Sequence, residues 1–212
     1  DLEKFNIKLE TIISDETSFY SKLKTKDKIS IYWNKVYEPD HLKLDKEIEK
    51  ILEKKNIPFK FFKGNILNEY QSITKNDGTP FKVFSPFWRN AEQVFLDAVP
   101  QKTSEIKKLK SKKTLFNSKD TFKQIMPKKD WFKKFDQYWK PSEDEAHKNL
   151  KEFISNRISK YGVDRDYPSI NGSSKLSPYI RNGQIHVAAI YEKSSKDIKK
   201  NISIRKYINE LG

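Results

Sequence analysis

The stretch NGSSKLSPYIRNGQIHVAAIY, residues 171–191, differs from the lysine-rich sequence around it and decides how the chain is interpreted. A serine-rich run, GSSKLS at 172–177, comes directly before Pro178. Because Pro is favoured at the first position of a helix, we predict a loop that leads into a helix with Ser177 as its N-cap. The pair Asn182-Gly183 predicts the end of that helix, since Gly adopts a left-handed conformation without strain.

The composition of this loop suits an anionic ligand. A helix N-terminus presents unpaired N–H groups and a partial positive charge. The serine hydroxyls and the lysine ammonium group of residues 173–177 add further donors, so a phosphate or pyrophosphate site is one interpretation. Serine-rich helix starts also turn and cap chains that bind no ligand. The spacing of the residues leaves both interpretations open.

Upstream of the loop, a helix is predicted to begin at Ser142. The sequence SEDE, residues 142–145, matches a capping box, and acidic residues in a first turn are favoured by the helix dipole. We therefore assign these carboxylates to capping and not to acid–base catalysis. Gly162 is predicted to end the helix, which places Tyr161 in its last turn. Five apolar residues at helical spacing should face the core: Ala146, Leu150, Phe153, Ile154 and Ile158.

The first part of the chain contains short apolar runs that are typical of strands. Between the last two runs, Pro39-Asp40 predicts the start of a helix with an apolar stripe along one side. Strand, helix and strand at this spacing predict a βαβ unit with parallel strands. A short helix is also predicted from Ser85-Pro86. The three predicted strands are IKLETII (7–13), ISIYW (29–33) and PFKFF (58–62).

The charge of the chain is strongly positive and unevenly distributed. The formal net charge is +14, and residues 101–134 hold 12 Lys against three acidic residues. A basic segment attracts nucleic-acid phosphate and releases counterions. Only five of the 43 basic residues are Arg, the side chain that recognises phosphate through two parallel donors, so we attribute part of the lysine excess to compositional bias. We predict a basic connector in this region.

The composition excludes several kinds of site. The chain has no Cys, so disulfides, thiolate zinc sites and Cys nucleophiles are excluded, and a cytoplasmic protein is expected. His41, His147 and His186 lie far apart without ligand-like companions, and we predict no metal site. No run approaches the roughly 20 apolar residues of a membrane helix, so no membrane partner is predicted. Four residues are interpreted as core and interface aromatics: Trp33, Trp88, Trp131 and Trp139.

Both ends of the sequence are interpreted as internal points of a longer protein. The chain begins without Met and ends on YINELG, inside a pattern that predicts an amphipathic helix. The apolar side of that helix should contain Ile204, Tyr207, Ile208 and Leu211. We therefore expect a fragment, monomeric in solution.

Four stretches in order resemble the photolyase/cryptochrome family, most closely its class I-like cyclobutane pyrimidine dimer photolyases. Residues 161–191 resemble a family segment that runs from Tyr through Arg-Asp and aromatic-Pro to Gly-Thr-Ser-Arg-Leu-Ser-Pro. The other three are SIYWNKVYEP (30–39), DGTPFKVFSPFWR (77–89) and KPSEDEAHKNLKEFI (140–154). The resemblance implies an α/β fold followed by an all-α region. Its parts would be a partial parallel-sheet antenna domain (1–100), a basic interdomain connector (101–140) and the first helices of the helical FAD-binding domain (141–212).

The resemblance also implies roles for individual residues. Arg165 matches a family position that contacts DNA near the mouth of the flavin cavity. Ser173 keeps the hydroxyl of the usual Thr, and Lys175 keeps the charge of the usual Arg without its planar fork. For Arg181 two interpretations stay open: its side chain supports the phosphate loop, or it only faces water. Six residues match positions that hold the phosphate and ribityl part of FAD: Tyr161, Ser173, Ser174, Lys175, Leu176 and Ser177.

The function implied is that of a deoxyribodipyrimidine photo-lyase, which splits cyclobutane pyrimidine dimers in UV-damaged DNA by electron transfer from excited reduced FAD. The resemblance places no catalytic residue in this chain. Asp40 and His41 replace the usual Asn and Glu of pterin-binding members, so the second, antenna chromophore stays open. His186 stands where the family has Ser or Thr, and the following helix is expected to lack its usual cap. Two alternatives remain: a cryptochrome-type blue-light photoreceptor, and a basic nucleic-acid-binding module without a cofactor.

Overall fold

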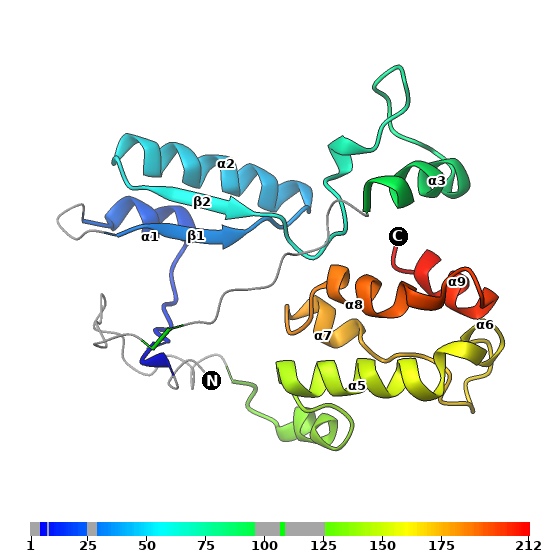
Figure 1. Cartoon of the computed structure of the whole chain (residues 1–212). Coiled ribbons are helices and arrows are strands. Elements are labelled where there is room, and N and C mark those ends of the chain that lie inside the picture. The colour runs from blue at the N-terminus through cyan, green and yellow to red at the C-terminus, as the bar shows by residue number, and fades with distance from the viewer. Residues whose placement is uncertain (1–4, 8, 25–28, 96–106, 109–125) are drawn as a thin grey trace. The chain divides into compact units, whose positions relative to one another are not determined.

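The computed structural model describes residues 5–7, 9–24, 29–95, 107–108 and 126–212, and these form two compact units. The first unit comprises the described residues between 5 and 64, together with 107–108 and 126–134. The second comprises residues 65–95 and 135–212. The first unit holds a two-stranded parallel sheet with helices, and the described elements of the second are helical (Figure 1). The predicted mixed fold, α/β followed by α, is confirmed. The predicted domain limits stay predictions.

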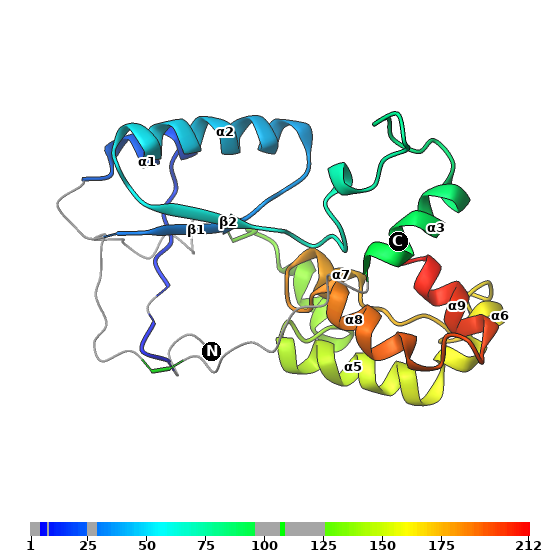
Figure 2. The ribbon, with the colours of Figure 1, turned by 45° about the horizontal axis from the view of Figure 1, so that its top comes forward.

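The βαβ unit forms as its sequence pattern predicts. Strand β1 (Ile31–Asn34) and strand β2 (Phe59–Phe62) are parallel, with Ile31 opposite Phe59, and helix α2 (Pro39–Lys54) connects them. Helix α1 (Glu16–Lys22) and α2 lie on the same face of this sheet (Figures 1 and 2). The core contains Leu23, Ile48, Leu52 and Ile57, with Ile31, Trp33 and Phe59 packed against it.

The other face of the sheet carries exposed aromatic rings. Successive side chains of a strand point to opposite faces, so Tyr32 points away from the core that Ile31 and Trp33 contact. Tyr32 is 64% exposed and Phe62 is 45% exposed, and their rings stack with centroids 6.4 Å apart. The two faces of this sheet therefore differ sharply in burial.

The strand predicted over residues 7–13 is wrong for the described residues of that run. Residues 9–13 have no regular structure and are followed by α1. Asp15 fixes the start of α1, because its carboxylate accepts a hydrogen bond from Ser18 N at 2.9 Å. Alternating apolar residues form a strand only beside a partner, and in the described part of the chain β1 and β2 pair only with each other.

The second unit, called the helical unit below, is built around one large apolar core. An ion pair between Arg205 Nη1 and Glu92 Oε1, 2.6 Å apart, ties its last helix to its first. The core includes the buried side chains of Trp88, Phe153 and Tyr179. The α-helices are α3 (Phe84–Phe95), α5 (Glu143–Asn156), α6 (Tyr161–Asp164), α7 (Ser177–Arg181), α8 (Val187–Ser194) and α9 (Ile202–Asn209); the 3-10 turns are η2 (Tyr70–Ser72), η4 (Ile158–Lys160) and η5 (Ser195–Asp197).

Helix α5 begins where the sequence predicts. Ser142 Oγ accepts a hydrogen bond from Glu145 N at 3.1 Å, which confirms the cap. The reciprocal bond of the capping box is absent, because Ser142 N donates to Lys140 O instead, at 2.9 Å. The predicted apolar stripe is confirmed: Ala146, Leu150, Phe153 and Ile158 are buried, and Ile154 is partly buried against them.

Gly162 does not end α5, contrary to the prediction. The helix ends at Asn156, and Gly162 lies inside the next short helix, α6. A Cβ atom at position 162 would lie 2.9 Å from Ser203 Oγ and 3.0 Å from Lys206 Cδ. Glycine at this position therefore allows α9 to pack closely against α6.

Helix α7 starts one residue earlier than predicted. Ser177 is its first helical residue and not its N-cap; Leu176 precedes it in a helical conformation, and no side-chain cap bond is formed. Leu176 is 1% exposed, so its burial in the core anchors this turn. The predicted end at Asn182-Gly183 is confirmed, because Gly183 has φ +69° and Gln184 N donates to Tyr179 O at 2.8 Å.

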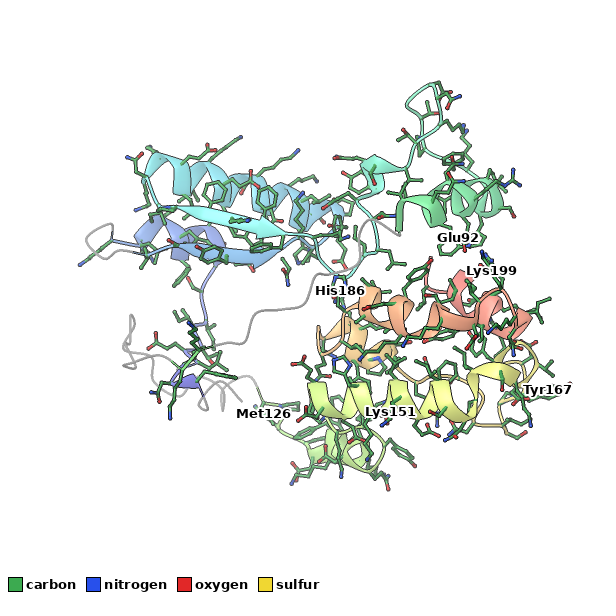
Figure 3. The ribbon with its side chains drawn as sticks, viewed as in Figure 1. Glu92, Met126, Lys151, Tyr167, His186 and Lys199 are labelled. Carbon is green, nitrogen blue, oxygen red and sulfur yellow. The ribbon has the colours of Figure 1, made fainter. Side chains whose placement is uncertain are left out.

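The expected loss of the usual Ser or Thr cap does not leave helix α8 uncapped, because His186 supplies a cap of its own. His186 Nδ1 accepts a hydrogen bond from Ala188 N at 3.1 Å. This contact requires that Nδ1 carries no proton, so an imidazole takes the place of the usual hydroxyl. His186 is labelled at the start of α8 in Figure 3.

The predicted basic connector lies mostly outside the described residues. Its described end, at 126–140, contains the 3-10 turn η3 (Asp130–Gln137), which spans the point where the two units divide. Trp131 is 61% exposed, whereas Trp88 is buried and Trp139 packs against the helical core. Each helix in the described part of the chain is too short or too polar to cross a lipid bilayer.

Candidate functional site

The serine-rich segment, residues 171–177, follows α6 in the chain and ends at the first residue of α7; it is called the serine loop below. It packs tightly against the end of α6 at Gly172. A Cβ atom at position 172 would lie 2.6 Å from the carbonyl carbon and oxygen of Asp164, closer than real Cβ contacts come. The loop therefore depends on glycine at this point.

Arg157, at the end of α5, binds the backbone of the serine loop. Its Nη1 donates hydrogen bonds to Ser173 O at 2.8 Å and to Asn171 O at 3.3 Å. The guanidinium group also pairs with the carboxylate of Glu152 and lies 5.5 Å from the Phe153 ring centroid. No sequence motif predicts this role, because Arg157 lies outside the motifs that identify the loop.

Three of the six predicted flavin residues are exposed. The side chains of Ser173, Lys175 and Ser177 are accessible at the surface of the helical unit. Lys175 has φ +54°, a left-handed conformation that residues other than Gly seldom adopt. Strained backbone conformations cluster at active sites and ligand-binding sites.

The other three predicted residues are turned toward the core. Tyr161 and Leu176 are 8% and 1% exposed. Ser174 shares a side-chain hydrogen bond with Tyr207, whose ring lies 5.0 Å from that of Tyr161 and 4.7 Å from that of Phe153. Burial raises the pKa of Tyr207 to about 12, against the opposing effect of its hydrogen bond to Ser174. Burial also raises the pKa of Tyr161.

Arg165, the predicted DNA contact, follows α6 with its side chain one third exposed. Its Nη1 donates to Glu210 Oε1 at 2.5 Å, and its guanidinium carbon lies 5.2 Å from the Tyr161 ring centroid. The hydrogen bond to Glu210 raises the pKa of Arg165 above its ordinary value. Arg165 is thus held by an acidic partner that the sequence analysis did not identify.

An open pocket of about 320 Å³ brings predicted residues together. Arg165, Ser173 and Lys175 line it, together with the segment from Tyr167 to Asn171. Tyr167 is labelled beyond the end of α6 in Figure 3. A second pocket, of about 540 Å³, is lined by Arg165 together with Phe84, Lys206 and Glu210 among others. Arg165 therefore lines both pockets.

The chemistry of this site favours anion binding. Arg165, Lys175 and Ser173 line one pocket, and their side chains can donate hydrogen bonds to phosphate oxygens; Asp164 lines it too and is the acidic residue of the pocket. His41 pairs with Glu38 at 3.2 Å, and Nδ1 of His147 lies 3.3 Å from Lys193 Nζ. Among the described residues no three potential metal ligands cluster.

Comparison with known proteins gives consistent matches. A family model described as DNA photolyase matches residues 1–107, half of the 212-residue chain. A deoxyribodipyrimidine photo-lyase of Agrobacterium fabrum is 28% identical over 177 residues, which cover 82% of this chain and 36% of the relative. One from Alkalihalophilus pseudofirmus is 31% identical over 180 residues, which cover 79% and 34%. The chain spans about a third of the length of these curated relatives.

A solved structure extends the match to nearly the whole chain. The crystal structure of a bacterial class III photolyase from Agrobacterium tumefaciens superimposes with a TM-score of 0.84 at 26% identity. The match covers 99% of this chain and 44% of that chain. The recognised family and the fold class are both confirmed by these matches. The closer likeness to class I members stays a prediction.

Proposed function

The chain belongs to the DNA photolyase family, and from this membership we propose that it is part of a deoxyribodipyrimidine photo-lyase, a light-driven enzyme that repairs DNA. The observation that carries the proposal is the pocket where Arg165, Ser173 and Lys175 meet. These positions match family residues that contact DNA and the flavin. A phosphate-rich cofactor beside phosphate-rich DNA requires such a concentration of donors.

The residues of the serine loop fit the diphosphate of FAD. Ser173, Lys175 and Ser177 are exposed and offer two hydroxyls and one ammonium group. The other three residues link the loop to the core. Ser174 bonds to Tyr207, whose ring packs against that of Tyr161, and Leu176 is buried. Reduced FAD, when bound, supplies light absorption and the electron that splits the dimer. The residues of the chain bind and orient it.

Arg165 contributes to the DNA interface in this proposal. A guanidinium group next to a DNA phosphate contributes to affinity without reading the base sequence. In the structure this group is paired with Glu210, so DNA must compete with the carboxylate for it. The 12 Lys of residues 101–134 add nonspecific attraction, which weakens as salt rises.

The repair activity can be tested on the full-length protein that contains this chain. We expect that blue or near-UV light removes cyclobutane pyrimidine dimers from a damaged oligonucleotide, whereas a dark control leaves them intact. Light-dependent flavin reduction without loss of dimers would instead identify a cryptochrome-type photoreceptor. A protein that binds DNA in a salt-sensitive manner without flavin absorbance would identify a nucleic-acid-binding module.

The DNA contact can be tested by a pair of substitutions with opposite signs. R165A should weaken binding of a dimer-containing duplex roughly fivefold to tenfold at fixed salt, through loss of one phosphate contact. E210Q should strengthen binding, because it releases Arg165 from its carboxylate partner. K151A is the control, because it also removes one positive charge but at an exposed position of α5. Equal effects of R165A and K151A would contradict the contact.

The isolated 212-residue chain is expected to behave differently from the full-length protein. Because the chain spans about a third of its relatives, most of a flavin cavity would come from elsewhere. We propose that the isolated chain retains no stoichiometric FAD and repairs no dimers. Purification of a yellow complex with one FAD per chain would contradict this.

A further inference from the structure

Arg157 makes two hydrogen bonds to the serine loop that the proposed function does not use. It is one of five arginines in the chain. Its Nη1 donates to the carbonyl oxygens of Ser173 and Asn171, and its side chain is only 16% exposed. Charge-assisted hydrogen bonds are stronger than neutral ones.

The bond to Ser173 O sets the direction of the next peptide group. In a trans peptide the C=O and the following N–H point in opposite directions. Because Ser173 O points toward the guanidinium group of Arg157, the N–H of Ser174 points away from it. No hydrogen bond from this N–H to a protein acceptor is present among the residues that the structure describes. The bond thereby keeps a carbonyl oxygen away from any anion at the loop.

Arg157 is itself held in place. The carboxylate of Glu152 pairs with its Nη2 atom, and the ring of Phe153 lies under the guanidinium group. The Gly172 contact with Asp164 fixes the loop between the two carbonyls that Arg157 binds. Arg157 does not line the pocket that contains Arg165, Ser173 and Lys175, so it acts on the loop and not on a ligand.

We infer that Arg157 is a positioning residue, which orients the serine loop so that its donors face the diphosphate of FAD. The inference rests on the proposed function. It differs from the roles assigned above, because Arg157 touches neither cofactor nor DNA. Its loss should weaken the binding of a phosphate-bearing flavin and change a phosphate-free flavin much less.

The experiment compares R157Q, R157K and K151Q in the full-length protein that contains this chain. Each apoprotein is titrated with FAD and with riboflavin, which has the same ring system without phosphate. We expect R157Q to weaken FAD binding about tenfold or more, and riboflavin binding less than about threefold. R157K should recover part of the loss, because it keeps the charge but lacks the fork. K151Q, a change of charge on the same helix, should match the wild type.

A second measurement does not depend on the flavin. Hydrogen exchange of the apoprotein should show faster exchange at the amides of residues 172–175 in R157Q than in K151Q, because the loop loses its anchor. If R157Q does not fold, the same titrations are made with R157K, for which we expect FAD affinity to fall about threefold. The midpoint of thermal unfolding is recorded for every variant.

The outcomes separate this inference from the proposed function. If the wild type binds FAD and R157Q binds it equally well, the positioning role is wrong and the proposed function is unaffected. If FAD and riboflavin are weakened equally, Arg157 has a purely structural role and the inference is also wrong. If the wild-type full-length protein binds no FAD, the proposed function fails and the role of Arg157 toward a flavin fails with it.

Discussion

Among the described residues, the helical unit buries nineteen apolar side chains in one cluster, whereas the βαβ unit buries four. Both units follow their local sequence patterns, but the helical unit has much the larger apolar core. The candidate site belongs to the well-packed unit, where the serine loop contacts Arg157, Tyr207 and, through Gly172, the end of α6 at Asp164. A binding loop with exposed donors therefore depends on the core beneath it.

The largest expected effect tests the difference in burial directly. Phe153→Ala removes a fully buried ring that contacts Tyr161 and Tyr207, and should lower the free energy of unfolding by about 3–5 kcal/mol. Phe62→Ala removes a ring that is 45% exposed, and should cost about 1 kcal/mol or less. Urea denaturation of both variants measures the difference. Equal losses would contradict the ranking of the two units.

Alkaline pH should weaken the helical unit through Tyr207. Burial raises the pKa of its phenol to about 12 from the ordinary value of 10.0, so the folded state holds this proton more tightly than the unfolded state. The stability is fully present below pH 10.0 and is lost as the pH rises toward 12, by about 2–3 kcal/mol in all. Denaturation at about pH 9 and about pH 11.5 should show this fall in the wild type.

The matched variant for this pH effect is Tyr207→Phe, which keeps the buried ring and removes the titrating hydroxyl. It should lose less stability than the wild type between the two pH values. An identical fall in both proteins would assign the effect to other groups.

A pair of glycine substitutions separates backbone contact from side-chain contact. Gly172→Ala places a methyl group 2.6 Å from the Asp164 carbonyl, and displacement of the loop should cost about 1–3 kcal/mol. Gly162→Ala meets Ser203 Oγ and Lys206 Cδ, which rotate away more easily, so its cost should be smaller. Thermal unfolding of the two variants gives the order. A larger loss of stability for Gly162→Ala would show that the serine loop adjusts to an added methyl group more easily than the contact between α6 and α9 does.

The smallest expected effect concerns the cap of α8. His186→Ala removes the Nδ1 acceptor of Ala188 N and should destabilise the helical unit by about 1 kcal/mol. His186→Ser restores an acceptor and should recover most of the loss. Chemical denaturation followed by far-UV circular dichroism measures both. Failure of His186→Ser to recover stability would show that packing of the imidazole, and not its hydrogen bond, matters here.

Elements with a complete local signal were predictable from the sequence. Helices α2 and α5 carry their start residues and apolar stripes within the helix itself, and Gly183 marks the end of α7 by its conformation. The strand predicted at 7–13 failed because alternation is a local pattern, whereas a strand needs a partner elsewhere in the chain. The prediction of Ser177 as the N-cap was wrong: the buried residue Leu176 takes that position, in a helical conformation.

The candidate site was predictable only in part for the same reason. The donors of the serine loop are contiguous, so a motif identifies them. Their supports are distant in sequence: Arg157 lies 16 residues from Ser173, and Glu210 lies 45 residues from Arg165. Helical spacing placed Tyr207 correctly in the core, but it carries no information about the Ser174 hydroxyl that the phenol meets.

The exposure of Ser173 makes the pocket accessible to site-specific labelling. The chain contains no cysteine, so Ser173→Cys introduces the only thiol in its 212 residues, at the rim of the pocket shared with Arg165 and Lys175. A maleimide dye attached there would report on whatever enters the pocket through its fluorescence. Its rate of attachment would measure how far an occupant shields the sulfur.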